Sequence, residues 1–315
     1  MAIAILWVVV SLIILYFGAD WLVKGSSSLA TRFGVTPLVV GLTVVALGTS
    51  MPELIVSVQA ALSGSPEISV GNVVGSNIFN IGVILGISAL IYPLSVQRQL
   101  LRLDMPVLIT AVGLFTVLFL DGRLGRWEGL LFFTGMIAYT VYMVWHARRG
   151  NLAGTSDAPV STIHVYKHWW SDAIFIVLGL LALILGSKIL VKYAVEIARM
   201  LQLSEAVIGL TIVAAGTSMP ELATSAVAAI KKNTDIAIGN IVGSCIYNIL
   251  LIMGTSALIK PIQAPAINYV DNLVMLAFTL ALLPLMRSGR RLNRWEGGLL
   301  LAGYVVYMLY LLKVF

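Results

Sequence analysis

The stretch that decides the fold is Gly48-Thr49-Ser50-Met51-Pro52-Glu53, which recurs letter for letter as Gly216-Thr217-Ser218-Met219-Pro220-Glu221. Each copy places two hydroxyls, a proline and a carboxylate inside a long apolar segment. A carboxylate at the depth of a bilayer is energetically expensive, so it normally faces a cavity or a partner and marks a functional site. Two identical copies predict that the Glu53 and Glu221 side chains are neighbours in the fold.

The rest of the sequence has the composition of an integral membrane protein. Of its 315 residues, 59% are hydrophobic and only 11% are charged, and the mean hydropathy is +0.99. A soluble globular protein averages roughly 25% charged residues. The basic residues behind the net charge of +6 stand singly or in pairs between apolar runs, which is typical of topology signals and not of a nucleic-acid-binding surface. The lipid bilayer is therefore the expected partner of most of the surface.

Apolar runs long enough to cross a bilayer, about 20 residues each, predict ten spans. The first has no basic residues ahead of it and is longer than a signal-peptide core of about 7–15 residues, so we expect it to stay in the membrane. A polar stretch at 147–170 separates two five-span repeats, 1–146 and 171–315, and we expect His146, His164 and His168 to lie at the surface in or beside it. The expected spans are 2–23, 35–62, 68–92, 104–120, 127–146, 171–195, 204–230, 236–259, 269–286 and 295–313.

The two halves of the chain match without any insertion, always at an offset of 168 residues. Positions 41–53 and 209–221 are identical at eleven of thirteen places, and 71–81 and 239–249 at eight of eleven. Because each half has five spans, an odd number, the second half must enter the membrane from the opposite side. The sequence therefore predicts an all-α membrane protein of ten transmembrane helices, arranged as two inverted-topology five-helix repeats.

The distribution of lysine and arginine predicts the orientation. With the N-terminus outside, thirteen of the twenty basic residues fall in cytoplasmic loops and seven on the other side. Cytoplasmic loops carry the excess of basic residues in membrane proteins. We therefore expect a multi-pass protein of the cell membrane with its N-terminus outside and its central loop in the cytoplasm. Three acidic residues at span ends are expected to be solvated caps: Asp20, Asp104 and Asp271.

The proline of the repeated motif predicts a break in its helix. Pro52 lacks an amide hydrogen, and its ring clashes with the carbonyl of Gly48. Carbonyls near Ala46 and Thr49 are then expected to lose their helical partners. Together with the Thr49 and Ser50 hydroxyls and the Glu53 carboxylate they form an all-oxygen set, which suits hard cations such as Ca²⁺ and Na⁺. The alternative is a proline-kinked packing helix with its polar groups bonded to neighbours, which leaves both glutamates unexplained.

A second repeated element follows each hexapeptide, at 71–80 and 239–248. Ser76 and Asn80 are four residues apart, so they lie on one face of a helix, and so do Ser244 and Asn248. Interhelical hydrogen bonding is one explanation of these pairs. With an oxygen-rich motif in the preceding span, cation coordination is the explanation we favour, whereas we expect the glycines of this element to serve helix packing.

Taken together, the two pairs of motifs resemble the α-repeats of the calcium/cation antiporter superfamily, and the Gly-Thr-Ser-x-Pro-Glu form is similar to its sodium/calcium exchanger branch. The resemblance covers essentially the whole chain, including the short central loop without a regulatory domain. It implies a transporter and not an enzyme, with Ca²⁺ and Na⁺ as transported ions and no cofactor. It also implies that the first spans of the two halves, 2–23 and 171–195, slide as a pair over the rest.

The resemblance implies a role for each motif residue. Glu53 and Glu221 would be the principal Ca²⁺ ligands, assisted by the backbone oxygens of Thr49 and Thr217. Asn80 and Asn248 would line the central position. Na⁺ would use both glutamates, the carbonyls of Ala46 and Ala214, and the hydroxyls of Ser50, Ser218, Ser76 and Ser244.

One position departs from the family pattern. Family members often carry an aspartate where this chain has Asn248, so only Glu53 and Glu221 bring negative charge to the expected site. One Ca²⁺ or two Na⁺ balance these two carboxylates, whereas a third Na⁺ leaves the site positive. This leaves the ion stoichiometry open.

The expected function is exchange of Na⁺ for Ca²⁺ by alternating access, with both ions competing for the same glutamates. A proton/calcium antiporter of the same fold is the first alternative, and Ca²⁺ uptake driven by a pH gradient without Na⁺ would identify it. A K⁺-assisted exchanger is disfavoured by Asn248, and a channel by the duplicated closed site. An intramembrane enzyme is disfavoured because the spans hold no histidine or cysteine nucleophile arrangement. The sequence leaves the oligomeric state open, a monomer included.

Overall fold

The structure is a computed structural model that describes residues 1–152, 169–201, 214–265, 267 and 269–311. Most of the predicted central loop, with His164 and His168, lies outside the described residues, as does the first part of the predicted span 204–230. The side chains of His146 and Ala214 are likewise outside the description.

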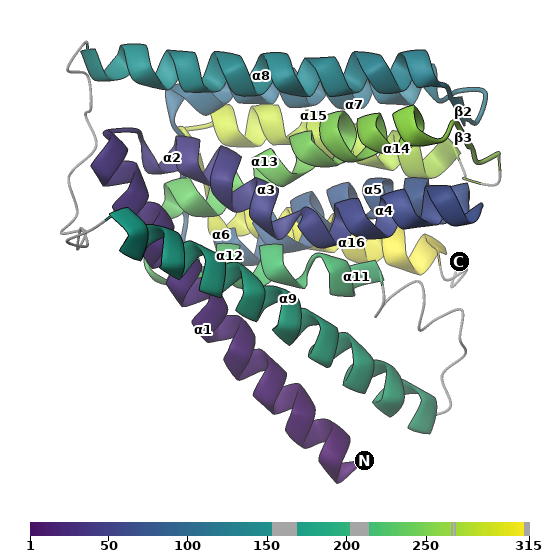
Figure 1. Cartoon of the computed structure of the whole chain (residues 1–315), viewed down its shortest axis with the longest axis horizontal. Coiled ribbons are helices and arrows are strands. Elements are labelled where there is room, and N and C mark those ends of the chain that lie inside the picture. Colours follow the sequence, from purple (N-terminus) through teal and green to yellow (C-terminus); the bar gives the residue numbers. More distant parts are fainter. Residues whose placement is uncertain (153–168, 202–213, 266, 268, 312–315) are drawn as a thin grey trace.

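Two long helices, α1 (Ala2–Phe33) and α9 (Trp169–Met200), pack against each other along much of their length and extend obliquely away from the rest of the molecule (Figure 1). They approach closely where Gly18 faces Gly179. A Cβ atom on Gly179 would lie 2.7 Å from the Leu22 nitrogen and 2.8 Å from the Gly18 carbonyl oxygen. Only 33% of the 18-residue apolar stretch of α1, and 28% of that of α9, is buried inside the protein. Both helices therefore present most of their surface outward.

The first hexapeptide lies in a span that is broken, as its proline predicts. This span consists of α2 (Pro37–Val40), a π-helical turn η1 (Gly41–Val45), α3 (Ala46–Thr49) and α4 (Met51–Ser63), with a 45° bend at Ser50. The second hexapeptide has the same break at Ser218, between α11 (Ala214–Thr217) and α12 (Met219–Ile230).

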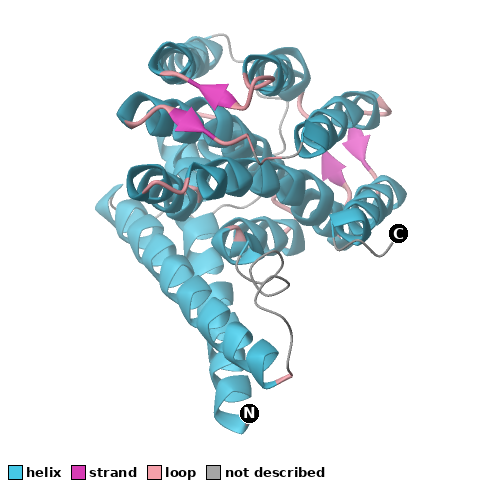
Figure 2. Cartoon of the chain, turned by 90° about the vertical axis from the view of Figure 1, so that its right-hand side faces the viewer, coloured by secondary structure: helices cyan, strands magenta, loops and turns pink. Residues whose placement is uncertain are grey.

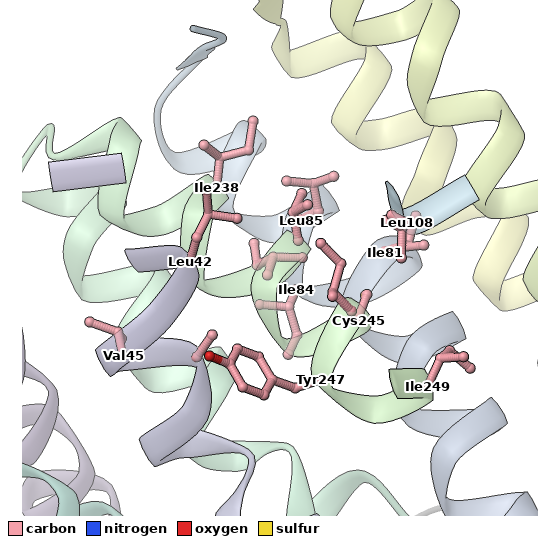
Figure 3. Packing of buried hydrophobic residues seen from close by; sticks show 14 of the residues in the cluster. Leu42, Val45, Ile81, Ile84, Leu85, Leu108, Ile238, Cys245, Tyr247 and Ile249 are labelled. Carbon is pink, nitrogen blue, oxygen red and sulfur yellow. The ribbon is translucent and has the colours of Figure 1, made fainter. Parts of the chain in front are cut away.

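The interior of the molecule is built from the spans that carry the second motif. These are α5 (Pro66–Phe79), η2 (Asn80–Leu85) and α6 (Gly86–Ile91) in one repeat, and α13 (Thr234–Tyr247), η5 (Asn248–Met253) and α14 (Gly254–Ile259) in the other. In the α13–α14 span 94% of the 18-residue apolar stretch is buried, so this span is surrounded by protein. Figure 3 shows side chains of η1, η2, α13 and η5 meeting in one apolar cluster that joins the two repeats.

The remaining helices are α7 (Met105–Leu118), which follows the π-helical turn η3 (Leu100–Asp104), α8 (Arg126–Leu152), α15 (Tyr269–Arg287) and α16 (Arg294–Leu311). By length and composition, six uninterrupted helices of the described residues could cross a membrane, and the bent α2–α4 segment makes a seventh. The helices α1, α8 and α9 run several residues past the predicted span ends. In α1 this extension stops at Gly34, whose φ of 63° ends the helix.

Two small antiparallel strand pairs, visible in Figure 2, were not expected from the sequence. β1 (Leu94–Ser95) pairs with β4 (Arg291–Leu292), and β2 (Arg123–Leu124) pairs with β3 (Ile262–Gln263). Each pair takes one strand from each repeat. Leu94 faces Leu292, and their equivalents 168 residues away, Ile262 and Leu124, face each other in the same way. The strand pairs therefore follow the same internal two-fold relation as the sequence.

The prediction that Asp20, Asp104 and Asp271 are solvated caps was wrong for Asp20 and Asp104, which are buried, whereas Asp271 is partly exposed in the first turn of α15. Asp104 is completely buried and accepts a hydrogen bond from the Tyr139 hydroxyl at 3.0 Å. Asp271 accepts one from Tyr307 at 2.9 Å, and Asp20 is paired with Lys24 at 2.7 Å and with Lys231. Lys24 is one turn away from Asp20 on α1, whereas Lys231, Tyr139 and Tyr307 come from other helices or their ends, which no pattern within a single span could indicate.

Candidate cation site

The two glutamates lie at equivalent positions, each in the first turn of the helix that begins after the break. Glu53 belongs to the start of α4 and Glu221 to the start of α12, and each side chain is only 1% exposed. The free amide groups and the dipole at a helix N-terminus favour negative charge there. Pro52 and Pro220, which lack an amide hydrogen, occupy the first turn without loss of a hydrogen bond.

Each glutamate is held by a serine of the other repeat. The Ser50 hydroxyl donates to Glu221 Oε1 at 3.0 Å, and the Ser218 hydroxyl donates to Glu53 Oε1 at 3.0 Å. Ser218 Oγ also lies 3.2 Å from Ser76 Oγ, and Ser244 Oγ lies 3.5 Å from Glu221 Oε1. The prediction that the two hexapeptides meet is therefore confirmed by the geometry. We call the buried group of side chains between the two helix breaks the cage; it consists of Ser50, Glu53, Ser76, Ser218, Glu221 and Ser244.

Four oxygen atoms of the predicted site residues are buried and have no hydrogen-bond partner among the described residues. A buried polar atom without a partner costs about 1–3 kcal/mol, and more when it is charged. Four such oxygens in two symmetry-related pairs are acceptors that need a cation or a proton donor. Carbonyl and carboxylate oxygens are the ligands that Ca²⁺ and Na⁺ take. The four atoms are Glu53 Oε2, Glu221 Oε2, Asn80 Oδ1 and Asn248 Oδ1.

The amide of Asn248 is oriented by Asn77, a residue that differs between the two repeats. Its Nδ2 donates to Asn77 Oδ1 at 3.1 Å, which leaves its Oδ1 as the free acceptor. The residue equivalent to Asn77 in the second repeat is Cys245. Both Asn80 and Asn248 begin π-helical segments, which are frequent at functional sites because they re-aim side chains out of the regular helical ladder.

The alanine and threonine positions need one correction. The Ala46 carbonyl does not lose its helical partner, because it accepts the Ser50 amide at 3.0 Å across the break. It also lies 3.4 Å from the Thr49 hydroxyl. The span therefore bends at Ser50 without freeing this oxygen. The backbone of Thr217 lies at the equivalent break, and Ala214 is the first described residue of its segment.

Two asparagines of the site were not among the predicted residues. Asn72 Nδ2 donates to the Ser57 hydroxyl at 2.9 Å and to the Glu53 carbonyl at 3.3 Å, while its Oδ1 accepts the Thr217 hydroxyl at 3.3 Å. Both asparagines stand in the repeated second motif, at positions 72 and 240, one turn before the predicted serines. That repetition is the signal by which they could have been found.

Asn240 repeats this pattern in the second half. Its Nδ2 donates to Ser225 Oγ at 2.9 Å and to the Glu221 carbonyl at 3.4 Å, and its Oδ1 accepts the Thr49 hydroxyl at 3.1 Å. Each asparagine thus bonds its own repeat's glutamate backbone to the other repeat's threonine. The described residues contain no cluster of three or more histidine, cysteine or acidic side chains, so the cage relies on two carboxylates and neutral oxygens.

Comparisons with known proteins agree with this architecture. The model of the sodium/calcium exchanger protein family matches residues 3–145 and again 171–313. The chain is 40% identical to "Putative antiporter CaxA" of Alkalimonas amylolytica, with 98% of both chains covered. It is 36% identical to the inner membrane protein YrbG of Escherichia coli, covering 98% of this chain and 96% of that protein.

Two further relatives carry the exchanger name. The chain is 32% identical to the sodium/calcium exchanger MaX1 of Methanosarcina acetivorans, covering 96% of this chain and 97% of that one. The solved structure of the sodium-calcium exchanger NCX_Mj without Na⁺ and Ca²⁺ matches with a TM-score of 0.85 and 33% identity, covering 99% of this chain and 100% of the other. The all-helical membrane fold of ten spans in two inverted repeats is thereby confirmed, as is the assignment to transporters and not to enzymes. The chain belongs to the sodium/calcium exchanger family.

Proposed function

We propose that this protein is a secondary antiporter that exchanges Na⁺ for Ca²⁺ at the single cage between the two helix breaks. The observation that carries the proposal is the pair of buried carboxylates, each held through one oxygen by a serine of the other repeat and each left with its second oxygen free. One Ca²⁺ between the two free oxygens neutralises both charges, and so do two Na⁺. Competition for the same carboxylates couples the two fluxes.

The ligand roles that we propose are those that the family resemblance implies. Ca²⁺ uses Glu53 and Glu221 with the backbone oxygens of Thr49 and Thr217, and Na⁺ draws on the wider set of oxygens. We place Asn80 and Asn248 at the centre, because their buried amide oxygens have no hydrogen-bond partner among the described residues. The support from relatives is that MaX1 is named a sodium/calcium exchanger and that NCX_Mj was soaked with Na⁺, Ca²⁺ and Sr²⁺. The Na⁺ sites include the carbonyls of Ala46 and Ala214 and the hydroxyls of Ser50, Ser218, Ser76 and Ser244.

We further propose that α1 and α9 move as one unit across the rest of the molecule while access alternates. Their mutual contact is tight and includes an ion pair from Arg32 to Asp172 at 2.6 Å, supported by Ser28 at 2.6 Å from the same carboxylate. Their contacts with the rest are fewer and partly polar, as at Asp20 with Lys231 and at Ser27 with Asn233. In this proposal the N-terminus lies outside and the chain resides in the cell membrane.

The experiment that tests the function is ⁴⁵Ca²⁺ flux in proteoliposomes with imposed gradients of Na⁺, K⁺ or pH. The expected result is Ca²⁺ uptake that is driven by an outward-directed Na⁺ gradient and stops when the gradient is removed. Uptake that follows a pH gradient in the complete absence of Na⁺ identifies a proton/calcium antiporter instead. A requirement for K⁺ on the Ca²⁺ side identifies the K⁺-assisted exchanger.

A further inference from the structure

The hydrogen bonds around Asn240 fix where a single proton lies. Asn240 is completely buried, and its Nδ2 group donates to both Ser225 Oγ and the Glu221 carbonyl. These two acceptors determine which end of the amide is the NH₂ group, so the oxygen end faces Thr49. An amide oxygen carries no hydrogen. The 3.1 Å bond between Thr49 Oγ1 and Asn240 Oδ1 must therefore use the hydroxyl proton of Thr49.

Thr49 has only this one hydroxyl proton to give. Two other acceptors lie close to the same hydroxyl oxygen, the Ala46 carbonyl at 3.4 Å and the Glu221 carboxylate. The Ala46 oxygen already accepts the Ser50 amide at 3.0 Å, so it has one lone pair left. A Thr49 hydroxyl that turned towards Ala46 would occupy that lone pair and compete with a cation for it. Asn240, the nearer acceptor, keeps the proton away.

We propose that Asn240 is a positioning residue that sets the affinity of the site for Na⁺ relative to Ca²⁺, by holding the Thr49 proton off the Ala46 carbonyl. The inference rests on the proposed exchange of Na⁺ for Ca²⁺, in which the Ala46 carbonyl serves Na⁺ and the glutamates serve both ions. Asn240 acts across the repeat boundary, since Thr49 and Ala46 belong to the first half and Asn240 to the second. Asn72 has the equivalent relation to Thr217.

The test compares two transport modes of the purified protein in proteoliposomes. In Asn240→Ala the hydroxyl loses its amide acceptor, and the inference requires that it turn to the Ala46 carbonyl and not to the nearby Glu221 carboxylate. The Na⁺ concentration for half-maximal Na⁺-driven Ca²⁺ flux is expected to rise about tenfold, the equivalent of one lost ligand interaction. The Ca²⁺ concentration for half-maximal Ca²⁺/Ca²⁺ self-exchange is expected to change less than about twofold. Asn272→Ala removes another buried amide, in α15, and should leave both values unchanged.

The decisive variant removes the proton itself. Thr49→Val keeps the shape of the side chain but has no hydroxyl, so in Thr49→Val with Asn240→Ala the Ala46 carbonyl is free again. The Na⁺ concentration for half-maximal flux in this double variant should return to that of Thr49→Val alone. If it stays as high as in Asn240→Ala, the proton does not act through Ala46 and the inference is overturned.

Three other outcomes separate the explanations. The Glu221 carboxylate also lies close to the Thr49 hydroxyl. In Asn240→Ala the half-maximal Na⁺ and Ca²⁺ concentrations could rise equally. Such a result would mean that the proton moves to this shared ligand or that the cage has collapsed, and it would overturn the inference. Wild-type protein without Na⁺-driven flux would overturn the proposed function as well. If Asn240→Ala does not fold, Asn72→Ala with and without Thr217→Val asks the same question in the other repeat, where Asn72 is partly exposed.

Discussion

Replacement of Glu53 by glutamine removes one negative charge from the cage and little else. Gln is isosteric with Glu, and its side-chain oxygen can still accept the Ser218 hydroxyl that now bonds Glu53 Oε1 at 3.0 Å. Glu53 is 1% exposed, so water cannot compensate for the lost charge. The effect on ion binding therefore reports the carboxylate itself, and Glu221→Gln offers the symmetric experiment through Ser50.

The expected loss is large. Two unit charges 4 Å apart attract by about 4 kcal/mol at an effective dielectric constant of 20. Each 1.4 kcal/mol is a tenfold change, so removal of one carboxylate weakens Ca²⁺ binding by a factor on the order of a thousand or more. At millimolar Ca²⁺ or below, both variants should show no Ca²⁺ flux above that of empty liposomes. Both variants should be impaired, because each glutamate is held in the same way by a serine of the other repeat.

The assay is ⁴⁵Ca²⁺ uptake by proteoliposomes, with circular dichroism and gel filtration in detergent to show that each variant is folded. Ser218→Ala is the matched control. It removes the hydrogen bond to Glu53 but keeps the charge, so it should weaken Ca²⁺ transport far less, by about tenfold for a hydrogen bond to a charged group. Wild-type flux from either glutamine variant would refute the assignment of the cage as the Ca²⁺ site.

Three further predictions concern charge, gating and packing. Asn248→Asp adds a third carboxylate and removes the donor to Asn77, so the number of monovalent cations exchanged per Ca²⁺ should rise, as a shifted reversal potential in voltage-clamped vesicles would show; an unchanged potential contradicts the central position of this residue. Asp20→Asn weakens the ion pair with Lys231 between α1 and the end of α12, a contact worth up to about 1 kcal/mol, and should change the maximal flux several-fold while the half-saturating Ca²⁺ concentration stays constant; a change confined to Ca²⁺ affinity would speak against movement of α1. Gly179→Ala forces a Cβ within 2.7 Å of the Leu22 backbone and should lower the melting temperature in detergent, at a cost of about 1–3 kcal/mol, whereas Gly113→Ala, with no atom within 4 Å of the new Cβ, should not; equal melting temperatures would contradict the close α1–α9 contact.

The sequence predicts the parts of this fold that depend on local chemistry and on the duplication. Pro52 removes an amide hydrogen, so the helix break at Ser50 follows from one residue type. The 168-residue offset pairs Glu53 with Glu221, and an odd number of spans in each half requires inversion. These are properties of single residues or of the whole chain, and both can be read without knowledge of which helices touch.

Contacts between particular side chains could not be predicted in this way. Asn72 and Asn240 stand in the repeated motif, but nothing in the sequence indicates that each reaches the threonine of the opposite repeat. The burial of Asp104 against Tyr139 depends on how the turn η3 lies relative to α8, which hydropathy does not determine. Likewise, the strand pairs join two-residue segments that are too short to give a pattern of their own.

The crossed bonds from Ser50 to Glu221 and from Ser218 to Glu53 have a consequence for biosynthesis. While the chain is inserted into the membrane, Glu53 enters the bilayer long before its serine partner at position 218 has been synthesised. A buried carboxylate without a partner is costly, so the first half should stay loosely packed or hydrated until the second arrives. Both strand pairs likewise need segments from each half. The two halves should therefore mature together, and a truncated first half should be a substrate for membrane quality-control proteases.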